Sequence, residues 1–473
     1  MKRTKIYQLS IAIAVMFLAG SCMVGPNFQK VEVDSPDAYR GTELTVDTLD
    51  LPVYTKVFND TVLLALIDSA LQNNYDAQMA LSRINESRAY LGMAKADLYP
   101  SITVGGNAAF GNTLGTFPTG LDAAGSFSAT ANVNWELVFW GKYRRATEAA
   151  RADLMASEYG YRVLQLSLIT QVANAYYNLL DYRKRLIIAQ RTLETRSEFL
   201  RIISERFDKG IVPEIDLNQA QIQEAYAAAS IPVYKRSVTF TENALSVLIG
   251  ENPQEIISAY TIDDLEIPEN IPVGMPSQLL ERRPDIFEAE QLFKAQNARI
   301  GVAQAMRFPS ISLTGLFGLA SADLSAFNAG DAVMGSVGAG LFGPVFQFGK
   351  NKRRVEAERE RTEQMRLNYE KAVISAFRET EDALVNIKTI EEEITYIEKQ
   401  VVASENAAKL SRQRYDGGIT SYLEVLDAER TLFEIELYHT DLQKRRLSAY
   451  SELYKVLGGG WTNDVVSEEN TAD

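Results

Sequence analysis

The sequence contains an internal repeat, and this repeat constrains the fold more than any other feature. Matching segments recur at a nearly constant distance, which is 208 positions for three pairs and 209 for a fourth. The pairs are Gly141-Lys142 with Gly349-Lys350, Gly210 with Gly418, Leu248-Ile-Gly250 with Val456-Leu-Gly458, and Tyr99-Pro-Ser-Ile102 with Phe308-Pro-Ser-Ile311. An internal duplication followed by one insertion or deletion leaves this pattern. The fold must therefore contain two copies of one arrangement of elements.

Each copy predicts the same order of elements: a helix that runs up to a proline, two strands, a very long helix, a glycine break and a further helix. The long helices are expected at 142–207 and 350–415, where no proline occurs. Such a helix is roughly 100 Å long at 1.5 Å per residue, which is about three times what a bilayer requires. A soluble coiled-coil scaffold is the alternative explanation. The other helices are expected at 61–97, 213–249, 276–307 and 422–457.

The predicted strands lie at about 101–138 and 310–347 and have a period of two. In Phe127–Leu137 every odd-numbered residue is apolar and every even-numbered residue is polar, as in a half-buried strand. Four strands cannot close a barrel in lipid, because open edges leave backbone groups unpaired and the smallest single-chain barrels have about eight strands. Either the strands form a small soluble sheet, or three chains pool them into a barrel of twelve. Trp135, Phe139 and Trp140 lie where an interfacial aromatic belt is expected.

The N-terminus has the order of a secretory signal. Lys2, Arg3 and Lys5 precede an apolar run at 11–19, and small residues then precede Cys22, the single cysteine of the chain. This order resembles a bacterial lipoprotein signal, in which the cysteine is acylated after residues 1–21 are removed. An ordinary signal peptide with an incidental cysteine is the alternative. Removal of 1–21 would change the net charge from −14 to −17.

Composition excludes several classes of function. A net charge of −14 argues against nucleic-acid binding, which requires clustered lysine and arginine. One cysteine and one histidine, His439, exclude an intrachain disulfide framework, cysteine zinc sites and most histidine-based catalysis. No G-x-x-x-x-G-K-[ST] motif for nucleotide binding occurs. From these exclusions we expect no catalytic residues and no metal. An enzyme based on carboxylates alone is the remote alternative.

The ordered set of motifs resembles the TolC-like outer-membrane factors, in particular their OprM/NodT lipoprotein branch. The motifs are Cys22-Met-Val-Gly-Pro-Asn-Phe28, Leu279-Leu-Glu-Arg-Arg-Pro-Asp285, Ile300-Gly-Val-Ala-Gln-Ala305, Phe308-Pro-Ser-Ile-Ser-Leu313 and Leu423-Glu-Val-Leu-Asp-Ala-Glu-Arg430. The resemblance implies an α+β membrane protein. In it, a homotrimer forms a 12-stranded β-barrel, with four strands per chain, that is continuous with a 12-helix periplasmic α-barrel.

The same resemblance implies location and partners. The protein would be lipid-anchored in the outer membrane of a Gram-negative bacterium and would extend into the periplasm. It would bind a periplasmic adaptor and an inner-membrane RND transporter, and would passively conduct drugs, toxic compounds or metal ions. An exit duct for type I protein secretion and a lipid-anchored scaffold without a pore remain alternatives. No cofactor is expected, and the lipid on Cys22 would be a covalent anchor.

The resemblance also implies a periplasmic gate. Leu423 and Asp427 match residues that line constrictions at the periplasmic mouth, and Tyr415 and Arg430 match residues that latch neighbouring helices there. The alternative is that Leu423 is a packing residue and Asp427 a solvated charge. Gln219 occupies the position of Asp427 in the first copy, so one ring of carboxylates is expected from this pair of positions.

The glycines predict turns, and the repeat predicts the division of the chain. Gly210, Gly417 and Gly418 are expected in turns at the helix tips, where an adaptor would bind, and Gly141 and Gly349 at strand-to-helix turns. The charges around Pro284, in the segment Glu281–Asp285, are expected to cap or pair rather than to catalyse. The expected segments are a signal at 1–21, an extended equatorial segment at 22–60, repeats at 61–260 and 261–460, and a disordered acidic tail at 461–473.

Overall fold

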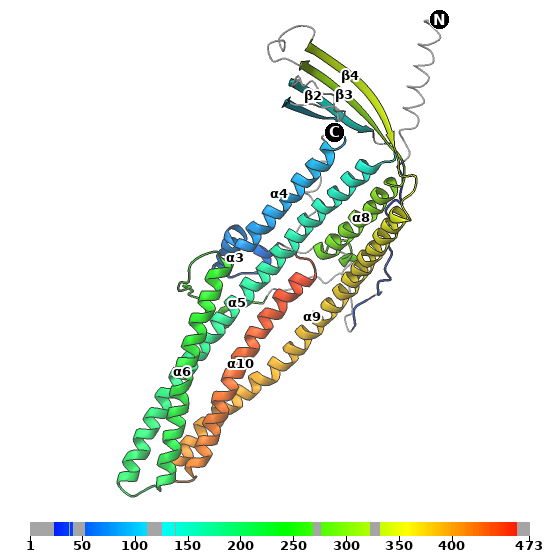
Figure 1. Cartoon of the computed structure of the whole chain (residues 1–473). Helices are drawn as coiled ribbons and strands as arrows, with labels where there is room; N and C mark the ends of the chain where they lie inside the picture. The colour runs from blue at the N-terminus through cyan, green and yellow to red at the C-terminus, as the bar shows by residue number, and fades with distance from the viewer. Residues whose placement is uncertain are drawn as a thin grey trace. The chain divides into compact units, whose positions relative to one another are not determined.

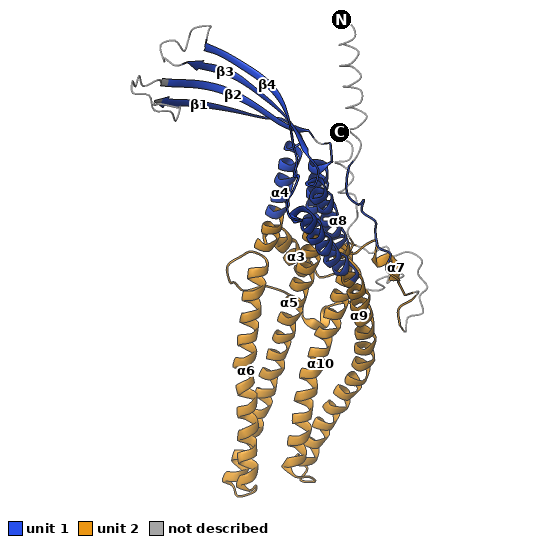
Figure 2. Cartoon of the chain, turned by 45° about the vertical axis from the view of Figure 1, so that its right-hand side comes forward, with its two compact units in different colours: residues 1–32, 82–158, 287–370 blue, residues 33–81, 159–286, 371–473 orange. Residues whose placement is uncertain are grey.

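The computed structural model describes residues 23–36, 38–40, 53–110, 125–137, 139–267, 276–321 and 332–460. The signal segment, Cys22 and the tail from 461 onward lie outside these residues. The described chain divides into two compact units, each of which takes segments from both copies of the repeat. Figure 2 colours unit 1 (1–32, 82–158 and 287–370) blue and unit 2 (33–81, 159–286 and 371–473) orange.

Unit 1 contains one antiparallel sheet of four strands in the order β1-β2-β3-β4, drawn side by side in Figure 2. The predicted strands are confirmed, except that the last one ends at Phe342 and not near 347. Gly343 and Pro344 follow directly, and proline has no N–H to continue the ladder. The bounds are β1 Ser101–Phe110, β2 Gly125–Leu137, β3 Ser310–Ser321 and β4 Val333–Phe342.

The register of the sheet places most of its large apolar residues on one face. Ile102 pairs with Val133, and Val133 in turn pairs with Gly315, which pairs with Val337. Since alternate residues of a strand share a face, all odd-numbered residues of β2, β3 and β4 lie on this face. They are Gly125, Phe127, Ala129, Ala131, Val133, Trp135 and Leu137, then Ile311, Leu313, Gly315, Phe317, Leu319 and Ser321, then Val333, Gly335, Val337, Ala339 and Leu341. The opposite face of β2 carries serine, threonine, asparagine and glutamate.

The long helices form as predicted, to within one residue at each end. Their bounds are α5 Lys142–Asp208 and α9 Lys350–Asp416, of 67 residues each, and α6 Glu214–Leu248 and α10 Tyr422–Val456, of 35 residues each. In Figure 1 the lower part of α5 runs beside α6 and the lower part of α9 beside α10, so each copy supplies one helical hairpin to unit 2. In the described parts of the chain, no helix is both long and apolar enough to cross a membrane.

The largest apolar core of unit 2 lies around the middle of α5. Tyr176, Leu179 and Leu180 are buried there against residues of α2 (Tyr54–Val57), α3 (Thr61–Asn73), α6 and α10. The Tyr176 hydroxyl donates to Asp60 at 2.6 Å, and Asp60 also accepts from the backbone N–H of Val62 at 2.7 Å as the N-cap of α3. A buried carboxylate with several donors is satisfied, so this polar group does not weaken the core.

Two predicted helices are each broken into two, and the predictions of unbroken helices are wrong at these points. The first breaks at Asn74, between α3 and α4 (Tyr75–Ala96), because the Asn74 side chain accepts from the N–H groups of Asp76 and Ala77 and caps α4. The second separates α7 (Pro276–Leu279) from α8 (Pro284–Ala305). Pro284 disfavours helical backbone at the residue before it and is tolerated at a helix start.

Candidate functional site

The α5–α6 and α9–α10 hairpins of unit 2 turn through the predicted glycines. Gly210 has φ +69° and Gly418 has φ +70°, values that favour glycine because it lacks a Cβ. The N–H of Gly418 donates to the carbonyl of Tyr415 at 3.0 Å, and the N–H of Ile419 donates to that of Arg414 at 2.9 Å. These two bonds define a Schellman motif. The turn at Gly210 has the matching pair of bonds.

We expect Gly418→Ala to destabilise the α9–α10 hairpin by about 1–2 kcal/mol, the cost of placing a Cβ in left-handed backbone. No atom lies within 4 Å of the added Cβ, so strain alone causes the loss. Gly92 in α4 has equally open space without a positive φ, so Gly92→Ala should be neutral or stabilising. Melting temperatures of the two variants give the comparison, and equal shifts would contradict it. Gly417 lies in the same turn without a positive φ.

An aromatic cluster joins the two hairpins just behind these turns. The rings of Phe199 on α5 and Tyr422 on α10 are stacked at 5.1 Å, and Tyr415 on α9 lies 5.8 Å from Phe199. The guanidinium of Arg206 lies 5.1 Å above the Tyr415 ring. Tyr415 is therefore buried inside the chain's own tip.

The other predicted gate residues lie together on one exposed face of α10. Leu423 and Asp427 are one turn apart, and both are exposed. Arg430 donates to Asp427 at 2.9 Å within the same helix. An exposed pair of this kind contributes little stability, so it leaves the Asp427 carboxylate accessible. The structure thus brings Leu423, Asp427 and Arg430 together and places Tyr415 in the aromatic cluster instead.

The strand-to-helix turns of unit 1 also use the predicted glycines. Gly141 has φ +75° and Gly349 has φ +82°. Trp140, directly before the first turn, donates from its indole to the carbonyl of Pro309 at 2.7 Å and stacks on Phe308 at 4.5 Å. The segments that begin α5 and β3 are therefore joined at the end of the sheet.

Arg145 holds the N-terminal segment, a role that sequence reasoning missed. Its guanidinium donates to the carbonyls of Val24 and Gly25, both at 3.3 Å, and to the Asn27 side chain at 2.8 Å. It also pairs with Glu148 at 2.7 Å. Arg145 is 1% exposed, so the segment 24–27 covers it. A buried charge with this many acceptors is fully engaged.

Close backbone approach strengthens this contact. A Cβ added to Gly25 would lie 2.5 Å from the Cα of Gly301 in α8. A Cβ added to Gly141 would lie 2.5 Å from the Met23 side chain. Glycine is therefore needed at both positions for the segment to lie against unit 1.

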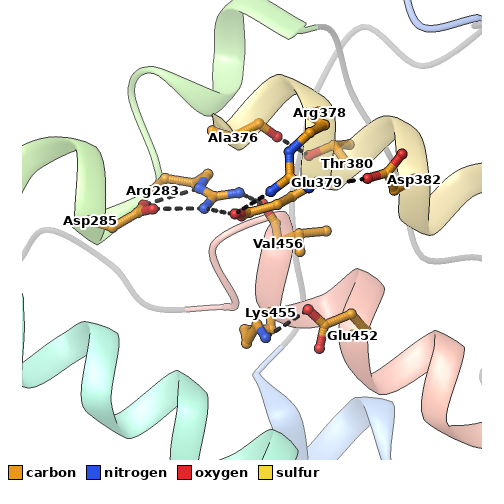
Figure 3. Close-up of polar contacts among 10 residues, drawn as sticks. All are labelled: Arg283, Asp285, Ala376, Arg378, Glu379, Thr380, Asp382, Glu452, Lys455 and Val456. Carbon is orange, nitrogen blue, oxygen red and sulfur yellow. Dashed lines mark hydrogen bonds and ion pairs between the residues drawn. The ribbon is translucent and has the colours of Figure 1, made fainter. Parts of the chain in front are cut away.

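Of the charges around Pro284, Arg283 and Asp285 pair, as predicted, and Arg283 also binds residues of α9 and α10 (Figure 3). Arg283 makes two bonds to Asp285, at 3.0 and 2.7 Å, and one to Glu379 on α9 at 2.7 Å. Its third nitrogen donates to the carbonyl of Val456, the last residue of α10, at 3.1 Å. Burial lowers the pKa of Arg283, but the two carboxylates outweigh that effect and raise it.

Comparison with known proteins decides the family. The sequence profile described as "Outer membrane efflux protein" matches residues 66–251 and 275–459, one match on each copy of the repeat. The chain belongs to the outer membrane efflux protein family. It is 32% identical over 470 residues to the toluene efflux pump outer membrane protein TtgC of Pseudomonas putida, covering 96% of this chain and 95% of that one.

Other members of the outer membrane efflux protein family agree. The cation efflux system protein CusC of Escherichia coli K12 is 30% identical over 467 residues, covering 97% of this chain and all of that one. A crystal structure of CusC superposes with a TM-score of 0.82 over 93% of this chain and all of that one at 30% identity. The open state of the Neisseria gonorrhoeae MtrE outer membrane channel gives 0.84 over 93% and 98% of the two chains at 29% identity.

Membership fixes function and location. The protein is an outer membrane component of an efflux system in a Gram-negative bacterium, and it extends into the periplasm. The family is one of transport ducts, and its structural neighbours are helix-rich, with four strands per chain. The resemblance inferred from the motifs is thereby confirmed.

Proposed function

We propose that three copies of this chain form one duct, with a 12-stranded β-barrel in the outer membrane and a 12-helix tube in the periplasm. The observation that carries the proposal is the sheet with one apolar face and one polar face. On the apolar face Val104 is 85% exposed and Val337 is 90% exposed in the single chain. An apolar face that alternates with a polar one is the pattern of strands between lipid and an aqueous lumen.

The two outer strands supply the second argument. β1 and β4 are the edges of the sheet, and an edge in lipid must pair with another strand. Pairing β4 of one chain with β1 of the next closes a ring once three chains have joined. The solved relatives OprN and MtrE are outer-membrane channels, which supports the same assembly.

The duct would pass small molecules delivered by a periplasmic adaptor and an RND transporter of the inner membrane. Relatives are named for the efflux of toluene and of cations and for the export of pyoverdine. In a passive duct, the pump and not the duct would select the substrate. The exposed turns at Gly210, Gly417 and Gly418 are the proposed adaptor contact, and Leu423, Asp427, Tyr415 and Arg430 the proposed gate region. The proposed repeats remain 61–260 and 261–460, after an equatorial segment at 22–60.

Native mass spectrometry of the detergent-extracted protein tests the assembly. A species of three processed chains is expected, and each chain should carry the mass of a diacylglyceryl group and an acyl chain on Cys22. Cys22→Ser is the matched control, since it should remove the lipid mass and leave the trimer. A stable monomer with the full strand content would contradict the proposed barrel, and an unmodified Cys22 would contradict the lipid.

A further inference from the structure

Behind the tip of unit 2, a cavity of about 470 Å³ lies between α5, α9 and α10. Its cationic lining residues are Arg191 and Arg196 from α5 and Lys409 and Arg412 from α9. Arg196 and Arg412 lie there together with Glu429 from α10. Glu429 follows Asp427 by two positions on the same helix. The cavity therefore brings one carboxylate of the proposed gate helix between cations on two other helices.

Each arginine has a buried donor that is not satisfied. Arg196 is 3% exposed, and its Nη1 donates to the carbonyl of Gln223 at 3.0 Å. Its guanidinium lies 5.3 Å from the Phe433 ring, and its Nη2 has no hydrogen-bond partner within the described chain. Arg412 donates from Nη2 to Glu429 at 2.7 Å, while its Nε has no partner among the described residues.

One carboxylate thus lies between a buried cation, Arg196, and a partly exposed one, Arg412, whose side chain is 39% exposed. Glu429 is the acidic group with the largest electrostatic effect on Arg196, although it hydrogen-bonds only to Arg412. Burial raises the pKa of Glu429 even though both guanidinium groups act to lower it. Three other acids line the cavity, and two of them are engaged, since Glu436 pairs with Arg191 and Asp416 with Arg206. The third is Glu405 on α9.

We propose that Glu429 is the positioning residue of the gate helix and has two alternative partners. In the described arrangement it ties α10 to α9 through Arg412, and in a second arrangement it ties α10 to α5 through Arg196. An unsatisfied buried donor costs free energy, and each arrangement gives the Glu429 acceptor to one arginine while it withholds that acceptor from the other. A device with two closely balanced states responds to a small bias. The link to gating rests on the proposed function.

The repeat shows that this arrangement is present once in each chain. The positions 208 residues away from Arg196, Arg412 and Glu429 hold Ser404, Ser204 and Gln221. None of these can form the same ion pair. The device therefore acts on α10, which carries Leu423 and Asp427, and not on α6.

A set of glutamine variants tests the proposal through melting temperature, which requires no conduction. Arg412→Gln and Arg196→Gln should each be tolerated, because each leaves one partner for Glu429. In the double variant the melting temperature should fall by much more than the sum of the decreases in the two single variants. The reason is that Glu429 then remains buried without a cation. Adding Glu429→Gln to the double variant should restore most of the loss.

Single partnership predicts a different pattern. If Glu429 pairs only with Arg412, Arg412→Gln alone should give the full loss and Arg196→Gln should add nothing, which would overturn the proposal. Arg191→Gln is the control, because it removes a more exposed cation from the same cavity and should change little.

Channel recordings test whether the exchange of Glu429 between its two partners affects gating. Arg412→Gln should raise the conductance of the closed channel severalfold and Arg196→Gln should not. The increase caused by Arg412→Gln should vanish in a Glu429→Gln background. A wild-type protein that never conducts would contradict the proposed duct, whereas a cooperative loss of stability in that same protein would still support the two partners of Glu429. Equal conductance changes in both single variants would count against the device.

Discussion

The closed channel should conduct severalfold better when Leu423 or Asp427 is replaced by alanine. Leu423→Ala widens the proposed constriction without changing its charge. Asp427→Ala removes three like charges from a confined lumen, in which inward-facing charges focus potential and attract counter-ions. A ring of carboxylates favours cations, so Asp427→Ala should also weaken a preference for cations. Reversal potentials across a salt gradient in planar bilayers measure this preference.

The first copy of the repeat supplies matched controls for both variants. Ile215 and Gln219 occupy the positions of Leu423 and Asp427 on α6, and Ile215 is also exposed. Gln219→Ala should leave ion preference unchanged, because it removes no charge, and Ile215→Ala should affect conductance less than Leu423→Ala. Anion selectivity of the wild type, or an Asp427→Ala channel identical to it, would remove Asp427 from the gate.

Arg283→Met should lower the stability of unit 2 by roughly 3 kcal/mol, which is typical of removing one partner of a buried ion pair. The change would leave Asp285 and Glu379 without their shared cation and would leave the Val456 carbonyl without this donor. The loss should appear as a drop of several degrees in the melting temperature of the detergent-extracted protein.

Two further variants show whether this effect belongs to the buried guanidinium. Arg378 lies beside it in Figure 3 and pairs with Asp382 at 3.6 Å and with Glu379 at 3.5 Å. Its side chain is 65% exposed, so Arg378→Met should change stability little. Arg283→Lys keeps the charge but loses the forked contact with Asp285, so an intermediate loss is expected. Equal melting temperatures for Arg283→Met and Arg378→Met would show that burial adds nothing.

The fold could be predicted from sequence wherever the signal is local or repeated. The absence of proline gave the extents of α5 and α9, and alternation gave the strands. The break at Asn74 could not be predicted in this way. Asn74 lies in a proline-free segment that fits one continuous helix. Its capping role depends on side-chain bonds, including one to the carbonyl of Leu248, 174 positions away.

The same distinction separates the site residues that were expected from those that were missed. Arg283 and Asp285 are two positions apart, so their pairing could be inferred. Arg145 binds residues 118–121 positions away, and Arg412 and Arg196 meet Glu429 only through packing of separate helices. The sequence nevertheless contains a usable signal. When the two copies of the repeat are aligned, Arg196, Arg412 and Glu429 each match an uncharged residue in the other copy.

Arg145 and Arg353 occupy the same position in the two copies, yet the first is 1% exposed and the second has a side chain that is 81% exposed. The N-terminal segment 24–27 covers Arg145, and it occurs once in each chain. Three chains would therefore bring six related repeats but only three such segments. The backbone of such an assembly would approach sixfold symmetry, because each chain contributes two similar repeats. Its side chains would have only threefold symmetry, because the two repeats differ in sequence. A ligand with six identical contacts would meet two kinds of site in alternation.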